Sequence, residues 1–128
     1  MPGPPFPYTI DPAARLATAQ LSGSVRGPDI AATYATIYRD PAFGPGFDLL
    51  WDATAITELL LDLNDLPSFV RLHSEFGDVA SSGRDIILVT RPMDKMMANM
   101  YATMMKKQNR EVRVCTSRQE VEQLRQAR

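Results

Sequence analysis

The stretch Phe47-Asp48-Leu49-Leu50-Trp51-Asp52 decides the fold, because it is a short, mainly apolar run that is closed by a carboxylate. Such a run is typical of a strand buried on both faces of a parallel sheet. The segment 85–90, with Ile86-Ile87-Leu88-Val89 inside it, has the same character, and residues 111–115 are predicted to form a third buried or edge strand. Strands that alternate with helical patterns predict a mainly parallel sheet with helical cover.

The flanking segments complete the predicted order of elements. The tight Asp11-Pro12 connection predicts an antiparallel pair of strands over residues 8–10 and 15–21, because parallel neighbours need a longer crossover. Ser22-Gly23 is expected to end the second strand, and residues 56–61 are compatible with a strand, a loop or a helical turn. Helices are predicted after Pro28, Asn64, Pro92 and Ser117. The fold class is therefore α/β, in the order β-β-α-β-α-β-α-β-α, with four helices and a mainly parallel four- to five-stranded sheet.

Length and composition predict one domain. The chain has 128 residues, which corresponds to a single domain over residues 8–128. Residues 1–7 contain four of the ten prolines and are expected to form a flexible tail. The net charge of -1 gives no reason to expect nucleic acid or an anionic membrane as a partner. With a single cysteine, Cys115, and no signal peptide or membrane-length apolar run, a cytoplasmic location is expected.

The chain resembles the STAS superfamily, which includes anti-sigma-factor antagonists and the cytoplasmic domains of sulphate transporters. The resemblance rests on the order of elements, on Asp40-Pro41-Ala42-Phe43 and on the run that ends at Asp52. It covers roughly residues 8–126 and implies a β–α superhelix with strands nearly in sequence order. It also implies a non-enzymatic bacterial regulatory or protein-interaction module, with a protein partner or a homodimer.

The regulatory serine of that superfamily has no counterpart in this chain. The superfamily carries a phosphorylatable serine in an Asp-Ser-Ser-Gly-Leu context, and the matching stretch here is Asp62-Leu63-Asn64-Asp65-Leu66. Leucine cannot accept a phosphoryl group, so Leu63 argues against a phosphorylation switch. We therefore expect a STAS-like interaction module without this switch.

A second hypothesis places a small anionic or amphipathic ligand, and a weak enzymatic activity as one variant, at the carboxyl edge of the sheet. Ligands of open parallel sheets bind beyond the carboxyl ends of the strands. The candidate residues there are Asp52, Thr54, Asn64, Asp65 and Arg91. The alternative is structural: Asp52 and Thr54 turn the chain while Arg91 is solvated.

Isolated reactive residues do not add a catalytic site. His73 lies on an apolar helical face, where a hydrogen-bonded core histidine is the favoured interpretation. Cys115 has no evident base beside it and is interpreted as a small buried residue. There is no phosphate-binding loop, dinucleotide fingerprint or metal-spaced set of His and Cys. No cofactor and no metal are therefore expected, and an enzyme is disfavoured.

Six of the seven methionines lie in the predicted third helix. Their helical spacing predicts that Met93, Met97, Met100 and Met104 are largely buried against the sheet. At least one of Met96, Tyr101 and Met105 is predicted to lie in a homodimer contact or to line a groove. Accordingly, Met100→Ala is expected to be costly, and Met105→Glu is expected to alter association while sparing the fold.

Overall fold

The computed structural model describes residues 6–127. Residues 1–5 of the predicted tail lie outside the described residues, and the tail prediction is wrong at Phe6, which is buried in the core. The chain forms β1 (Tyr8–Asp11), β2 (Leu16–Arg26), α1 (Gly27–Arg39), β3 (Asp48–Leu60), α2 (Asp65–Phe76), η1 (Gly77–Ala80), β4 (Arg84–Leu88), α3 (Pro92–Met104), η2 (Met105–Lys107), β5 (Glu111–Cys115) and α4 (Arg118–Gln126). This confirms the predicted order, to which the structure adds the two 3₁₀ turns η1 and η2.

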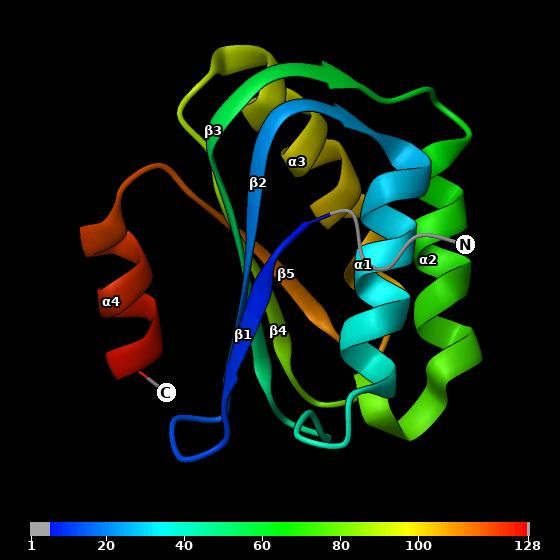
Figure 1. Cartoon of the computed structure of the whole chain (residues 1–128), viewed down its shortest axis with the longest axis vertical. Helices are drawn as coiled ribbons and strands as arrows, with labels where there is room; N and C mark the ends of the chain where they lie inside the picture. The colour runs from blue at the N-terminus through cyan, green and yellow to red at the C-terminus, as the bar shows by residue number, and fades with distance from the viewer. Residues whose placement is uncertain (1–5, 128) are drawn as a thin grey trace.

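The five strands form one sheet in the order β1-β2-β3-β4-β5. β1 runs antiparallel to β2, and every later pair is parallel, as the sequence predicts. Alternate residues of β3 face opposite layers: Leu49 and Trp51 pack in the larger core with α1, α2 and α3, whereas Leu50 packs with Val121 of α4. Figure 1 shows α4 alone on one side of the sheet, with α1 and α2 on the other.

β2 and β3 extend further than predicted. Their pairing continues to Arg26 and Leu60, whereas β4 pairs only with residues 49–52 of β3. The prediction that Ser22-Gly23 ends β2 is wrong, because the register shifts there without breaking the pairing, and Gly23 takes a φ of 69° at the irregularity. Bulges of this kind bend a strand pair. Figure 1 shows the extended pair curving over one end of the molecule towards α1 and α2.

The predicted inner face of α3 is wrong by roughly one helical position. Met93, Met100 and Met104 are 62%, 39% and 39% exposed, and only Met97 of the predicted set is partly buried against the core. The face that packs on the sheet instead consists of Asp94, Ala98 and Tyr101, and Met105 of η2 continues it. Methionines occupy both faces of this helix, so the pattern of apolar residues alone did not select the correct one.

Candidate functional site

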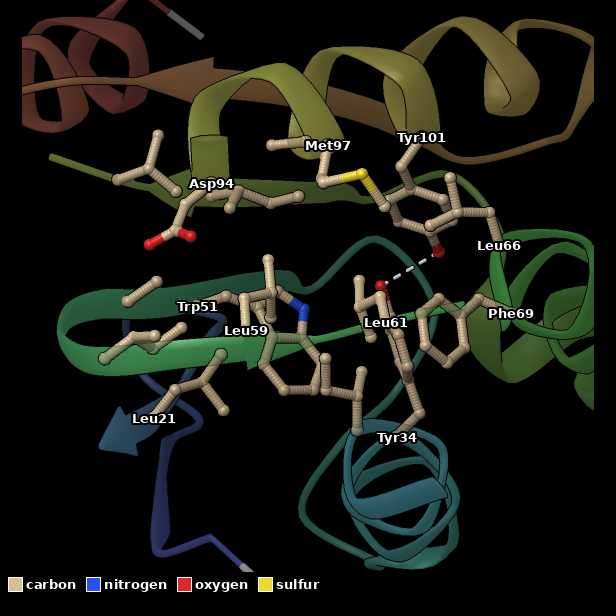
Figure 2. A pocket seen from close by; sticks show the side chains of 16 residues that line it. Leu21, Tyr34, Trp51, Leu59, Leu61, Leu66, Phe69, Asp94, Met97 and Tyr101 are labelled. Carbon is tan, nitrogen blue, oxygen red and sulfur yellow. Dashed lines mark hydrogen bonds between the residues drawn. The ribbon is translucent and has the colours of Figure 1, made fainter. Parts of the chain in front are cut away.

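A cavity of about 70 Å³ lies in the larger core, near the carboxyl ends of the strands. One buried water needs only ~10–15 Å³, so this space exceeds an ordinary packing gap. The residues that line it belong to β2, α1, β3, α2, β4 and α3 or directly follow β3 and β4, and they are mostly apolar (Figure 2): Leu21, Ile30, Tyr34, Trp51, Ala53, Ile56, Leu59, Leu61, Leu66, Phe69, Ile87, Val89, Asp94, Met97, Ala98 and Tyr101. The curved extension of β2 and β3 supplies one wall.

Among the described residues that line the cavity, Asp94 is the only charged one. It lies in the first turn of α3 and is 2% exposed. Within residues 6–127 neither of its carboxylate oxygens accepts a hydrogen bond, and its one ion pair is with Nε of Arg91, at 3.5 Å. Burial raises the pKa of Asp94 above its ordinary value, and the charge of Arg91 opposes that rise only in part. The site therefore holds an acceptor with unused capacity.

Trp51 supplies a donor to the same cavity. It lies on β3, is almost fully buried, and its indole Nε1 has no hydrogen-bond partner among the described residues. Its ring packs edge-on against Tyr34, with 4.6 Å between the ring centroids. A buried indole N–H usually finds a partner, so this one is also available.

The hydroxyl groups of Tyr34 and Tyr101 meet at the other end of the cavity, 3.0 Å apart (Figure 2). Behind them lies a buried polar network. Tyr34 donates a hydrogen bond to Asp85, and the hydroxyl of Tyr101 lies 3.4 Å from Nδ1 of His73. His73 Nδ1 is also 2.7 Å from the carbonyl oxygen of Phe69, in line with the favoured interpretation of a core histidine.

Asp85 and Arg110 form the centre of this network. Arg110 Nε donates to Asp85 at 2.6 Å, and its other nitrogens donate to the carbonyl oxygens of Phe47, Ala80 and Arg84. Burial raises the pKa of Asp85, but the charge of Arg110 and the neighbouring His73 and Tyr34 outweigh it and bring that pKa to about 2. Each group of the pair thus holds the other in its charged form.

Asp52 and Thr54, two of the predicted site residues, do not lie in the cavity. The Asp52 carboxylate accepts hydrogen bonds from the backbone and hydroxyl of Thr54 and pairs with Arg118 of α4 at 2.6 Å. Burial raises the pKa of Asp52, but these contacts lower it below its ordinary value. Asp52 thus shares a salt bridge with α4, whereas Arg91, its predicted neighbour, pairs with Asp94.

The remaining predicted site residues have local contacts. Asn64 sits at the N-terminus of α2 but makes no side-chain cap. The carboxylate of Asp65 accepts from the backbone of Asp62 at 2.8 Å and lies close against Gly27, where a side chain on residue 27 would clash. Arg91 donates to the carbonyl oxygen of Ile56 and reaches the rim of the cavity through Asp94.

The three predicted interface residues separate into two groups. Met96 is 49% exposed on the outer side of α3, whereas Tyr101 and Met105 are buried in the core. Met96 alone is therefore placed on the surface of the described chain.

Sequence reasoning also missed two residues of the cavity: Trp51 was assigned only to a strand, and Asp94 was not selected. The one available signal was a lone aspartate within an otherwise methionine-rich helix.

None of the described helices is long and apolar enough to cross a membrane. No cluster of three or more His, Cys, Asp or Glu side chains within residues 6–127 is arranged to hold a metal ion.

Comparison with known proteins gives a structural likeness. No protein-family model and no curated protein matches the sequence. A solved structure that matches is that of an uncharacterized protein of the DUF3478 family, with a SpoIIAA-like fold, from Shewanella loihica PV-4. The likeness has a TM-score of 0.55 at 12% sequence identity and covers 85% of this chain and 82% of that one. The chain thus has the SpoIIAA-like fold, which is the STAS-like fold that its sequence resembles.

Proposed function

We propose that this chain is a non-enzymatic binding module that takes up a small, mainly apolar molecule in its cavity. The observation that carries this proposal is a cavity of about 70 Å³ that holds a buried carboxylate without a hydrogen bond from the described residues. Protein cores contain few voids larger than a water, and a buried charge without hydrogen bonds is costly. A ligand that fills the space and bonds to Asp94 offsets both costs.

The same arrangement favours a regulatory role in which a ligand replaces phosphorylation. Leu63, which stands where relatives with the switch have serine, is 72% exposed in the turn before α2. Leu66 and Phe69 of α2 line the cavity, so a bound ligand contacts α2, the helix that directly follows the turn with Leu63. We propose a bacterial, cytoplasmic setting, which the free thiol of Cys115 supports.

A negatively charged ligand is disfavoured in this cavity. The cavity wall carries the carboxylate of Asp94 and is otherwise almost entirely apolar. An anion would be desolvated there next to a like charge. Of the anionic and amphipathic ligands expected from the sequence, an uncharged amphipathic one fits this site.

Binding can be followed through Trp51, because it is the single tryptophan of the chain and it lines the cavity. Titration with 1-hexanol or toluene is expected to change the tryptophan emission in a saturable way. The same ligands are expected to raise the melting temperature, since a molecule that binds only the folded state stabilises it. Fluorescence titration and thermal unfolding measure the two effects.

The matched variants are Ala53→Leu and Ala55→Leu on β3. Ala53 is buried in the cavity wall, so leucine there fills the space and is expected to weaken binding at least tenfold. Ala55 is exposed and lies outside the wall, so its variant should bind like the original protein. If folded Ala53→Leu binds as well as Ala55→Leu, the ligand does not occupy this cavity and the proposal fails.

A homodimer is a second candidate, favoured by four exposed methionines on one side of α3: Met93, Met96, Met100 and Met104. Exposed apolar patches often mark interaction sites, and two copies of one helix face can meet across a twofold axis. Met96→Glu is expected to shift the protein towards monomer in sedimentation experiments while leaving its melting temperature nearly unchanged. A protein that is monomeric at every concentration before substitution would contradict this second candidate.

A further inference from the structure

We propose that the molecule bound in the cavity is an uncharged, mainly apolar alcohol, whose hydroxyl group donates a hydrogen bond to Asp94. This inference rests on the proposed function and specifies the chemistry of its ligand. Figure 2 shows Asp94 projecting from the first turn of α3 and Trp51 from β3, with both side chains among the residues around the cavity.

Asp94 provides the acceptor. Its side chain is 1% exposed and neither oxygen accepts a hydrogen bond from the described residues, although Nε of Arg91 lies 3.5 Å away. Hydrogen bonds between neutral donors and charged acceptors are stronger than those between neutral groups. A donor that reaches this carboxylate therefore gains more here than it would at an exposed acceptor.

Trp51 carries an unbonded donor in the same wall. Its Nε1 carries a hydrogen and has no acceptor among residues 6–127, while the packing of its ring against Tyr34 limits how it can turn away. The tyrosine hydroxyls at the far end are already engaged with each other and with Asp85. The unused polar capacity of the wall is thus one carboxylate acceptor and one indole donor.

A hydroxyl group matches this inventory better than a charged group does. An ammonium group has three donors and no acceptor, so it would have one carboxylate for three donors. It would also share Asp94 with Arg91, which already pairs with it. A carboxylate would face Asp94 as a like charge. A hydroxyl group donates once and accepts, and it adds no charge to an apolar wall.

The test compares two isomers, 1-hexanol and 1-methoxypentane, which have the same atoms but differ in whether they carry an O–H donor. The full chain is titrated with each, and Trp51 emission and the melting temperature are recorded. We expect 1-hexanol to bind roughly tenfold more tightly than the ether, because a hydrogen bond to a charged group contributes about that factor. Hexanoate and hexylammonium are expected to bind at least tenfold more weakly than 1-hexanol.

Two variants test whether Asp94 causes the preference for the alcohol over the ether. Asp94→Leu removes the acceptor at similar size and is expected to bind the alcohol and the ether equally. Asp94→Asn keeps a carbonyl acceptor and is expected to retain an intermediate preference for the alcohol. Both are compared at temperatures where circular dichroism shows them folded, and Asp94→Asn alone suffices for the comparison if Asp94→Leu does not fold.

The outcomes separate this inference from the function on which it rests. An alcohol preference that disappears in Asp94→Leu, or falls in Asp94→Asn, supports it. Equal binding of the two isomers to the unchanged protein, or tighter binding of hexanoate or hexylammonium, overturns the hydroxyl assignment. If that binding is still abolished by Ala53→Leu, the cavity remains a ligand site. If neither toluene nor any of the four compounds binds, the proposed function fails together with this inference.

Discussion

Replacing Arg110 with methionine is expected to lower the free energy of unfolding by about 3–5 kcal/mol, the range found when one partner of a buried ion pair is removed. Arg110 and Asp85 are both almost fully buried and lie 2.6 Å apart. The substitution leaves the Asp85 carboxylate charged in the core and removes the donors that bind the carbonyl oxygens of Phe47 and Arg84. Urea unfolding of the two proteins at pH 7 measures the difference.

Arg118→Met is the matched control. Arg118 also pairs with an aspartate at 2.6 Å, but its side chain is 66% exposed, and exposed ion pairs contribute about 0–1 kcal/mol. We therefore expect this variant to lose less than about 1 kcal/mol. Equal losses in Arg110→Met and Arg118→Met would contradict the role assigned to the buried pair.

The pH dependence of the free energy of unfolding is an independent test of the Asp85–Arg110 pair. The pKa of Asp85 is about 2 in the folded protein, below its ordinary value of 3.8. Because the folded pKa is depressed, the contribution of Asp85 is fully present above about pH 4 and is lost as the pH falls towards 2. In Arg110→Met the lowering charge is gone and burial raises this pKa, so acidification through pH 4 should cost Arg110→Met less stability than it costs the original protein.

The sheet could be predicted from the sequence because its strands carry strong, local signals. The apolar runs inside β3 and β4 are continuous, and Val112 and Val114 alternate with charged residues in β5. The extension of β2 beyond Ser22 was missed because a glycine commonly ends a strand. Here Gly23 instead takes a positive φ where the register shifts, and the pairing of β2 with β3 continues beyond it. Whether β2 ends or continues at Gly23 depends on its pairing with β3, and the local sequence pattern carries no information about that pairing.

The cavity could be predicted only in its general position. The rule that ligands bind near the carboxyl ends of parallel strands directed attention to this end of the sheet. It selected Asp52, however, whereas the neighbouring Trp51 lines the cavity. Successive residues of a strand face opposite sides, so a choice between positions 51 and 52 requires knowing which helices cover each face. Asp94 was missed for a related reason, since an aspartate in the first turn of a helix is ordinarily exposed.

The network around Asp85 was not predictable from spacing. Arg110 follows Asp85 by 25 residues, and Tyr34 precedes it by 51. The contact arises because β5 pairs beside β4, with Glu111 opposite Arg84, which brings Arg110 to the start of β4. A charged residue next to a strand end is usually solvated, whereas here the rings of Tyr38 and Phe43 pack against the Arg110 guanidinium and make it a buried partner.

Replacing Met105 with alanine is expected to lower the free energy of unfolding by about 2–5 kcal/mol, as truncations of buried methionine do. Met105 is 1% exposed and packs in the larger core, so alanine leaves an unfilled space among Tyr101 and the other core residues. This reverses the expectation from the sequence, in which Met105 was a surface residue and Met100 a core residue. Met105→Glu should consequently unfold the protein instead of altering its association.

Met100→Ala is the matched comparison, because it makes the same chemical change in α3, which directly precedes the η2 turn that contains Met105. Met100 is 39% exposed, so much of its side chain already contacts water and the expected loss is below about 1 kcal/mol. Urea unfolding of both variants measures the difference directly. A larger loss for Met100→Ala than for Met105→Ala would mean that α3 packs with its methionine face inward. Asp94 would then turn out of the core with the rest of its face, and the cavity would lose the carboxylate on which its ligand chemistry depends.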